Sequence, residues 1–136
     1  MRRSALVLAA VLWAAVLWAV PLARAADTQV DLELILAVDV SRSMDLDEQQ
    51  LQRDGYVAAI MHPEVIDAIT QGRHGRIALS YIEWAGPDIQ YKVVDWRAID
   101  GPDSARAFAA ALSQAPIQRF RGTSISNSLV FVAPQF

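Results

Sequence analysis

The chain has no cysteine, and its 136 residues include only 2 histidines, 6 glycines and 6 prolines. Without cysteine it cannot form a disulfide framework, a thiolate metal site or a cysteine nucleophile. No repeat, low-complexity tract or long Gly/Ser linker follows Asp27. These absences predict one small domain, stabilised by an apolar core or by a bound ion.

The first 25 residues have the pattern of a secretory signal peptide. Arg2 and Arg3 precede an uncharged apolar run, Ala5 to Val20, and an A-x-A pattern at Ala23 and Ala25 follows it. Cleavage between Ala25 and Ala26 predicts a periplasmic or secreted product that meets the membrane only through its signal peptide during export. The alternative is an uncleaved membrane anchor, although the run is shorter than the roughly 20 residues that span a bilayer.

Basic charge is scarce in the remaining domain, residues 26–136. Without Arg2, Arg3 and Arg24 it keeps nine basic side chains against 15 acidic ones, a formal charge of −6. An acidic chain without a Lys/Arg cluster is poorly suited to nucleic acid, so no nucleic-acid partner is expected.

Hydrophobic patterning predicts an α/β domain. We expect strands at Leu32–Val38, Arg76–Trp84 and Ile89–Trp96, and helices after Asp45, from Pro63 to Gly72, over Asp100–Ala115 and from Thr123 to Pro134. The first two strands should be parallel, and the short turn at 85–88 makes the last two a hairpin.

Three packing predictions follow from the same patterns. The nearly continuous apolar run of Leu32–Val38 indicates a central strand buried on both faces. In the helix after Asp45, Leu51, Gly55 and Ala58–Ala59 recur at helical spacing, and Gly55 is expected to allow close approach to the sheet. With only a hairpin available on one side, the other edge of the first strand should be bare.

Directly after the first strand, Asp39, Ser41 and Ser43 stand at alternate positions. In extended or looped backbone this spacing points the three side chains the same way, at the strand end where open α/β sheets hold ligands. Hard oxygen donors of this kind suit Mg²⁺, Mn²⁺ or Ca²⁺. The alternative is that they cap the following helix and satisfy a turn.

The D-x-S-x-S pattern at 39–43, with Gly122-Thr123-Ser124 some eighty residues later, resembles the metal-ion-dependent adhesion site of von Willebrand factor A domains. The runs 81–87 and 119–126 also resemble a family of uncharacterised bacterial secreted proteins with that fold. The similarity covers residues 29 to about 133. It implies a three-layer, Rossmann-like, mostly parallel sheet of strand order 3-2-1-4-5-6 with an antiparallel edge strand.

The resemblance also implies roles for the site residues. Ser41 and Ser43 would bind the cation directly, Asp39 mostly through water, and Thr123 directly or through water. A partner protein would supply an acidic side chain to the open coordination position. The hydroxyls add little charge, which leaves the cation electrophilic enough to accept that carboxylate.

The chain departs from the family pattern at its end. The family site has a further Asp after the fourth strand, whereas this sequence ends at Phe136. Only the N-terminal half to two-thirds of the fold is expected, either as a truncated product or as a short variant completed by another chain.

Other candidate residues have weaker support. His62 before Pro63 is interpreted as a helix start, and His74 as part of a turn. Ser80 lies in a strand without a G-x-S-x-G elbow. Trp84 and Trp96 are expected to pack near strand ends, and Arg119 and Arg121 to be solvated beside the site, where they could steer an acidic partner.

The leading hypothesis is an exported, non-enzymatic protein that binds a partner protein through a divalent cation held by Asp39, Ser41, Ser43 and Thr123. One alternative is a Mg²⁺-dependent hydrolase of phosphate esters, since acidic strand ends can hold Mg²⁺ for that chemistry. Another is a truncated remnant whose site does not function.

Overall fold

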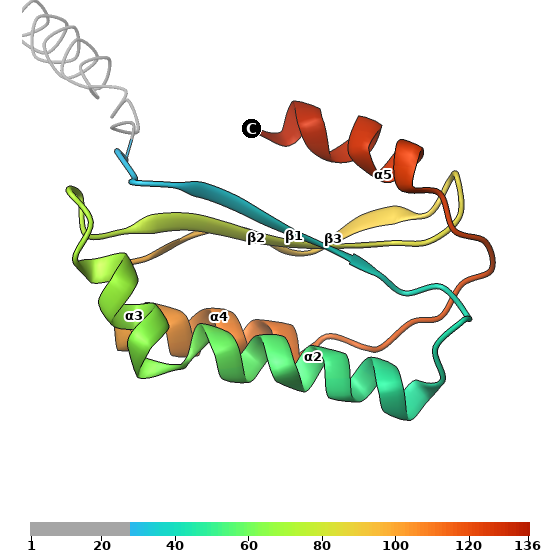
Figure 1. Cartoon of the computed structure of the whole chain (residues 1–136), viewed down its shortest axis with the longest axis horizontal. Helices are drawn as coiled ribbons and strands as arrows, with labels where there is room; N and C mark the ends of the chain where they lie inside the picture. The colour runs from blue at the N-terminus through green and yellow to red at the C-terminus, as the bar shows by residue number, and fades with distance from the viewer. Residues whose placement is uncertain (1–27) are drawn as a thin grey trace, which may run out of the picture.

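The computed structural model describes residues 28–136, so the predicted signal peptide and its cleavage site lie outside the described residues. Three strands form one mixed sheet (Figure 1). Strand β1 (Glu33–Asp39) pairs in parallel with β2 (Ile77–Trp84), and β2 pairs antiparallel with β3 (Gln90–Ile99). The predicted parallel pair and hairpin are therefore confirmed, and the fold is α/β.

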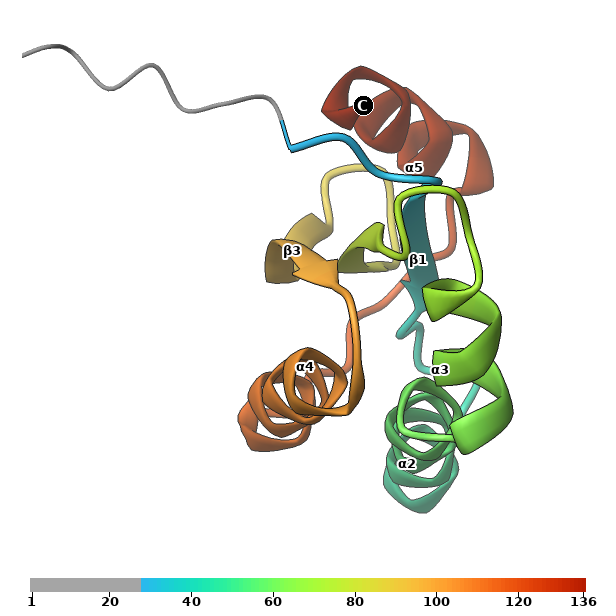
Figure 2. The same cartoon turned by 90° about the vertical axis from the view of Figure 1, so that its left-hand side faces the viewer.

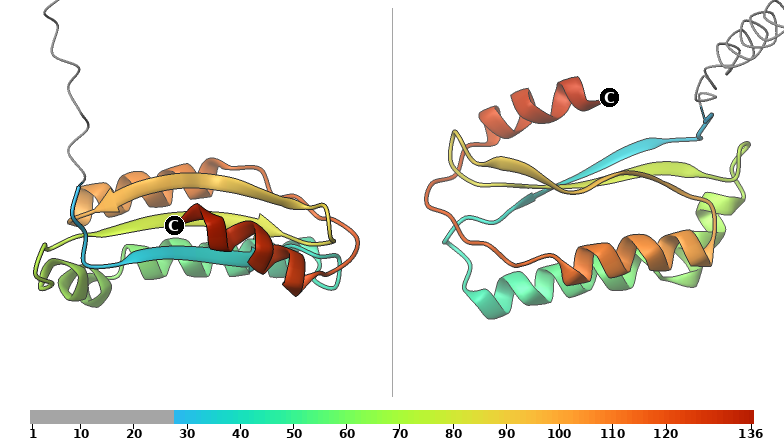
Figure 3. Two further views of the ribbon diagram at one scale, coloured as in Figure 1. Left: turned by 90° about the horizontal axis from the view of Figure 1, so that it is seen from above. Right: turned by 180° about the vertical axis from the view of Figure 1, so that it is seen from behind.

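Helices cover both faces of this sheet. Helices α2 (Leu46–Ile60) and α3 (Pro63–Thr70) connect β1 to β2 and lie, with α4 (Pro102–Gln114), on one face (Figure 2). Helix α5 (Ile125–Val132) and the 3₁₀ turn η1 (Ala133–Gln135) lie on the opposite face (Figure 3). None of the helices in this part of the chain is long and apolar enough to cross a membrane.

Local hydrogen bonds fix the starts of these helices. Helix α2 begins after Asp45 as predicted, with a capping box: Glu48 N–H donates to Asp45 at 2.9 Å, and Asp45 N–H donates to Glu48 at 2.8 Å. His62 caps α3 as predicted, because its Nδ1 accepts from the backbone N–H of Glu64. Helix α5 begins two residues later than predicted, since Ser124 is its N-cap.

The most deeply buried strand is β2, not β1. Seven of its eight residues are buried, and its side chains Leu79 and Tyr81 join α4 residues Phe108 and Leu112 in the core. By contrast, Leu34 in β1 is 36% exposed. The prediction that the first strand is buried on both faces is wrong for the described residues, because β1 is an edge of the three-stranded sheet and β2 is its centre.

The predicted buried face of α2 is also wrong. Leu51 is 74% exposed, and nothing lies within 4 Å of a Cβ built on Gly55, so this glycine does not approach the sheet. The buried residues of α2 are Gln49, Arg53 and Ile60. Two of these are polar, and they can be buried because polar partners meet them inside the fold.

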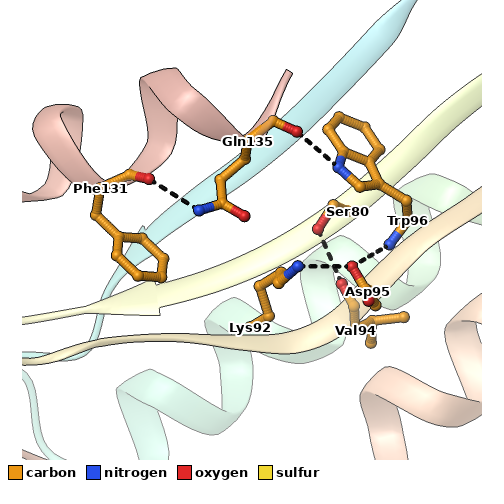
Figure 4. Close-up of polar contacts among 7 residues, drawn as sticks. All are labelled: Ser80, Lys92, Val94, Asp95, Trp96, Phe131 and Gln135. Carbon is orange, nitrogen blue, oxygen red and sulfur yellow. Dashed lines mark hydrogen bonds and ion pairs between the residues drawn. The ribbon is translucent and has the colours of Figure 1, made fainter.

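Helix α5 and the turn η1 are anchored to β3 through the predicted packing residue Trp96 (Figure 4). The indole N–H of Trp96 donates to the backbone oxygen of Gln135 at 3.1 Å, and its ring lies 5.8 Å from that of Phe136. Ser128 is the buried residue of α5. The end of the described chain therefore crosses the sheet face that the other helices leave open.

Candidate functional site

Strand β1 carries three of the predicted ligands to the carboxyl end of the sheet. Asp39 Oδ1 accepts a hydrogen bond from the backbone N–H of Ser41 at 2.7 Å, and the hydroxyls of Ser41 and Ser43 lie 3.0 Å apart. Ser41 is 2% exposed, whereas Ser43 is exposed. Ser41 thus contacts both of the other residues, and the cluster extends from the interior to the surface.

The loop that carries Thr123 runs beside this cluster. Phe120 forms a parallel bridge with Ser41: its N–H donates to Val40 O at 3.2 Å, and its carbonyl accepts from Arg42 N–H at 2.9 Å. Thr123 is exposed three residues further on. Two segments far apart in the sequence, 39–43 and 120–123, therefore meet at one edge of the sheet.

The same loop is attached to the end of β2. Val40 N–H donates to Trp84 O at 2.9 Å, and Ser124 N–H donates to the next carbonyl, that of Ala85, at 2.7 Å. The residue before Ser41 and the residue after Thr123 therefore bond to neighbouring carbonyls at the end of β2. These backbone contacts fix where the segment that carries Thr123 lies relative to β1.

Two glycines allow this close approach. Gly122 has φ +83°, and a Cβ built on it would lie 3.2 Å from the Cα of Gly86. A Cβ on Gly86 would lie 2.9 Å from Arg121 O. Since any side chain would push the two backbones apart, glycine is needed at this contact.

A buried polar network beneath the site was not predicted. Arg53 of α2 forms an ion pair with Glu83 of β2, and also donates to Ala115 O at 2.5 Å. The Tyr91 hydroxyl donates to Glu83 at 2.5 Å; burial first, and then this bond, raise the pKa of Tyr91. The one available sequence signal was a charged residue, Glu83, in the mostly apolar run of β2, residues 77–84.

The arginines beside the site take different positions. Arg121 is exposed, as predicted. The expectation that Arg119 is solvated is wrong, because its side chain turns inward: Nη2 donates to Met44 O at 2.5 Å, and Nε is buried. The exposed Arg42 follows the bridging residue Ser41, as Arg121 follows Phe120.

The remaining candidates have structural contacts. The His74 backbone N–H donates to Asp31, which holds the start of the described chain against the turn before β2. The Ser80 hydroxyl donates to Val94 O at 3.0 Å inside the sheet (Figure 4). Trp84 is 9% exposed at the end of β2. The Ser80 hydroxyl is thus satisfied within the sheet, and Trp84 is buried at the end of its strand.

The donor set at the site consists of one carboxylate and hydroxyls. Within residues 28–136, no three His, Asp or Glu side chains gather where they could hold a metal. Carboxylate and hydroxyl oxygens are hard donors, which bind Mg²⁺, Mn²⁺ or Ca²⁺ in preference to zinc. The chemistry open to these residues is therefore the binding of a hard cation or of a polar group.

The fold and the site define an α/β protein with polar residues at the carboxyl end of a three-stranded mixed sheet, an arrangement compatible with a Rossmann-like fold. The chain belongs to the family described as protein of unknown function, DUF1194, whose model matches residues 29–136. A comparison with curated proteins finds no match. The predicted membership of an uncharacterised family is thus confirmed, while the von Willebrand factor A assignment stays a prediction.

Proposed function

We propose that this chain is an exported von Willebrand factor A-like protein that binds a partner protein through a divalent cation, Mg²⁺ or its substitutes Mn²⁺ and Ca²⁺. Asp39, Ser41, Ser43 and Thr123 would hold the cation. The observation that carries the proposal is the bridge between Ser41 and Phe120, which brings the two halves of the motif to one edge of the sheet.

The donor set fits this cation. Asp39 supplies charge, and Ser41 and Ser43 supply neutral oxygens 3.0 Å from each other. A site with one carboxylate leaves a divalent cation with net positive charge, so it retains affinity for an anionic group from outside. The cation, when bound, would supply that electrostatic attraction.

The surroundings favour an acidic partner. Arg42 and Arg121 follow the two bridged residues, both are exposed, and neither takes part in an ion pair among the described residues. Like charges that follow two bridged residues on neighbouring segments repel one another. A carboxylate-bearing partner would relieve that repulsion and would approach faster through electrostatic steering.

The first test is Mg²⁺ binding to the full chain by calorimetry and thermal unfolding. Mg²⁺ at 100 times its Kd should stabilise the fold by about 2.7 kcal/mol. The double variant Ser41→Ala/Ser43→Ala should fold and lose this effect, because it removes two ligands and no charge. Ser113→Ala, an exposed serine on α4, should retain it.

Three results are decisive against the proposal. Unchanged Mg²⁺ affinity in the double variant would show that the hydroxyls are not ligands. Absence of cooperative unfolding in every sample would indicate a fragment without a working site. Phosphate release from an aryl phosphate that needs Mg²⁺ and disappears in Asp39→Ala would support the hydrolase alternative instead.

A further inference from the structure

The Arg119 side chain forms hydrogen bonds with the loop that carries Ser41 and Ser43. Its Nη2 donates to the backbone oxygens of Met44 at 2.5 Å and Arg42 at 3.4 Å. These two carbonyls immediately follow Ser41 and Ser43. A planar guanidinium has several donors in a fixed arrangement, so one side chain can hold two carbonyls at a set separation.

The backbone of the next residue, Phe120, also bonds to this loop. Phe120 bonds to Val40 and Arg42, on either side of Ser41, so residues 119–120 contact the serine loop through both side chain and main chain. Thr123 follows within three residues. The segment 119–120 is therefore the direct physical connection between the two parts of the proposed site.

Helix α2 also forms a hydrogen bond with this loop. Gln49, which is 3% exposed, donates from Nε2 to Ser41 O at 3.4 Å. Gln49 Oε1 and Arg119 Nε are both buried without a hydrogen-bond partner among the described residues. Leaving such atoms unpaired is costly.

We propose that Arg119 is a positioning residue: by binding the carbonyls of Arg42 and Met44, it sets where Ser41 and Ser43 lie relative to Thr123. This inference rests on the proposed function, in which all three side chains hold one cation. It differs from the sequence interpretation, in which Arg119 acts as a surface charge toward a partner.

A positioning role and a purely electrostatic role for Arg119 predict opposite effects of its removal on the affinity for Mg²⁺. A nearby positive charge repels Mg²⁺, so if Arg119 acts only as a charge, its removal should tighten Mg²⁺ binding. If Arg119 orders the ligands, its removal should weaken binding, as loss of a residue that orients metal ligands commonly does by about 10- to 100-fold. The sign of the change separates the two roles.

The experiment measures the Kd for Mg²⁺ in the full chain and in three variants. Arg119→Ala should weaken binding at least about tenfold. Arg119→Lys keeps the charge but lacks the planar fork, so it should recover only part of the affinity. The matched control is Arg121→Ala, which removes the same charge two residues away and should not weaken binding.

A metal-free measurement keeps this inference distinct from the proposed function. Amide hydrogen exchange of Arg42, whose N–H bonds to Phe120 O, should be faster in Arg119→Ala. The amide of Ala78, bonded to Leu32 O at the far end of the sheet, should be unchanged. If Arg119→Ala does not fold, the exchange rate of the Arg42 amide is measured in Arg119→Lys instead.

Two results overturn the positioning role. One is Mg²⁺ binding by Arg119→Ala that is as tight as, or tighter than, that of the unmodified chain. The other is an unchanged exchange rate at Arg42. If the unmodified chain binds no Mg²⁺ at all, the proposed function fails, and the exchange rate alone decides whether Arg119 orders the loop.

Discussion

At the scale of single residues, the least expected feature is the ion pair between Arg53 and Glu83, which are 3% and 1% exposed. Two charges removed from water are tolerated only when they satisfy each other and further hydrogen bonds complete the set. Here Tyr91 and the backbone of Ala115 provide those bonds. The pair links α2 to the middle strand and to the end of α4.

Removing one partner of this pair should be far more damaging than removing both. Arg53→Met leaves a buried carboxylate without its cation and should lower the free energy of unfolding by about 3–5 kcal/mol. Arg53→Met/Glu83→Leu should recover most of that loss. Urea denaturation measures both effects, and Arg106→Met, at an exposed pair with Asp103, is the control that should change little.

A small effect in the single variant would contradict this account. If Arg53→Met lost less than about 1 kcal/mol, the pair would behave like a surface ion pair, and its burial would not govern its energetics. Equal losses in the single and double variants would instead point to packing of the long arginine side chain as the main contribution.

At the scale of elements, the site depends on how closely the loop before α5 approaches the turn between β2 and β3. Gly86 and Gly122 make that approach possible, and Gly122 also adopts a positive φ. Helix α2 contains a glycine with neither constraint, Gly55, in its exposed middle. Glycine therefore has opposite energetic consequences in these two elements.

Alanine at the two positions should shift stability in opposite directions. Gly122→Ala should destabilise the fold by about 1–2 kcal/mol, because an L side chain is strained at that φ. Gly55→Ala should stabilise it by about 0.5–1 kcal/mol through better helix propensity. Urea unfolding of the two variants tests this, and destabilisation by Gly55→Ala would indicate a contact on that face of α2.

At the scale of the whole molecule, the outer edge of β1 has no partner strand among residues 28–136. An apolar cavity of ≈ 240 Å³ lies between the sheet and helices α2 and α3, and its lining includes Leu34 and Leu36 of β1. A strand with unpaired backbone groups beside apolar surface favours pairing with another chain. The sequence-based expectation of a bare edge thus holds for the described residues.

We therefore expect the chain to self-associate as its concentration rises. Ala37→Lys places a charge on an exposed position of β1 and should lower this association, since edge lysines oppose strand pairing. Sedimentation velocity over a concentration series measures the effect. Ala107→Lys adds the same charge on the exposed face of α4 and should leave association unchanged; equal effects of both variants would assign the change to net charge.

The sequence by itself determined the elements and the local part of the site. Apolar periodicity, the Asp45 capping box and the turn at 85–88 act between neighbouring residues, and the tight turn after β1 groups Ser41 with Ser43. These interactions are short in sequence range. They can therefore be inferred without knowledge of the tertiary structure.

Only the tertiary structure decided which surfaces meet. Strand pairing placed β2 at the centre of the sheet and β1 at its edge. The ion pair with Glu83 buried the polar side of α2, whereas helical periodicity had predicted that the side with Leu51 is buried. The inward turn of Arg119 depends on carbonyls 75 and 77 residues away. Such contacts depend on the global arrangement, because each polar group is buried only where a distant partner satisfies it.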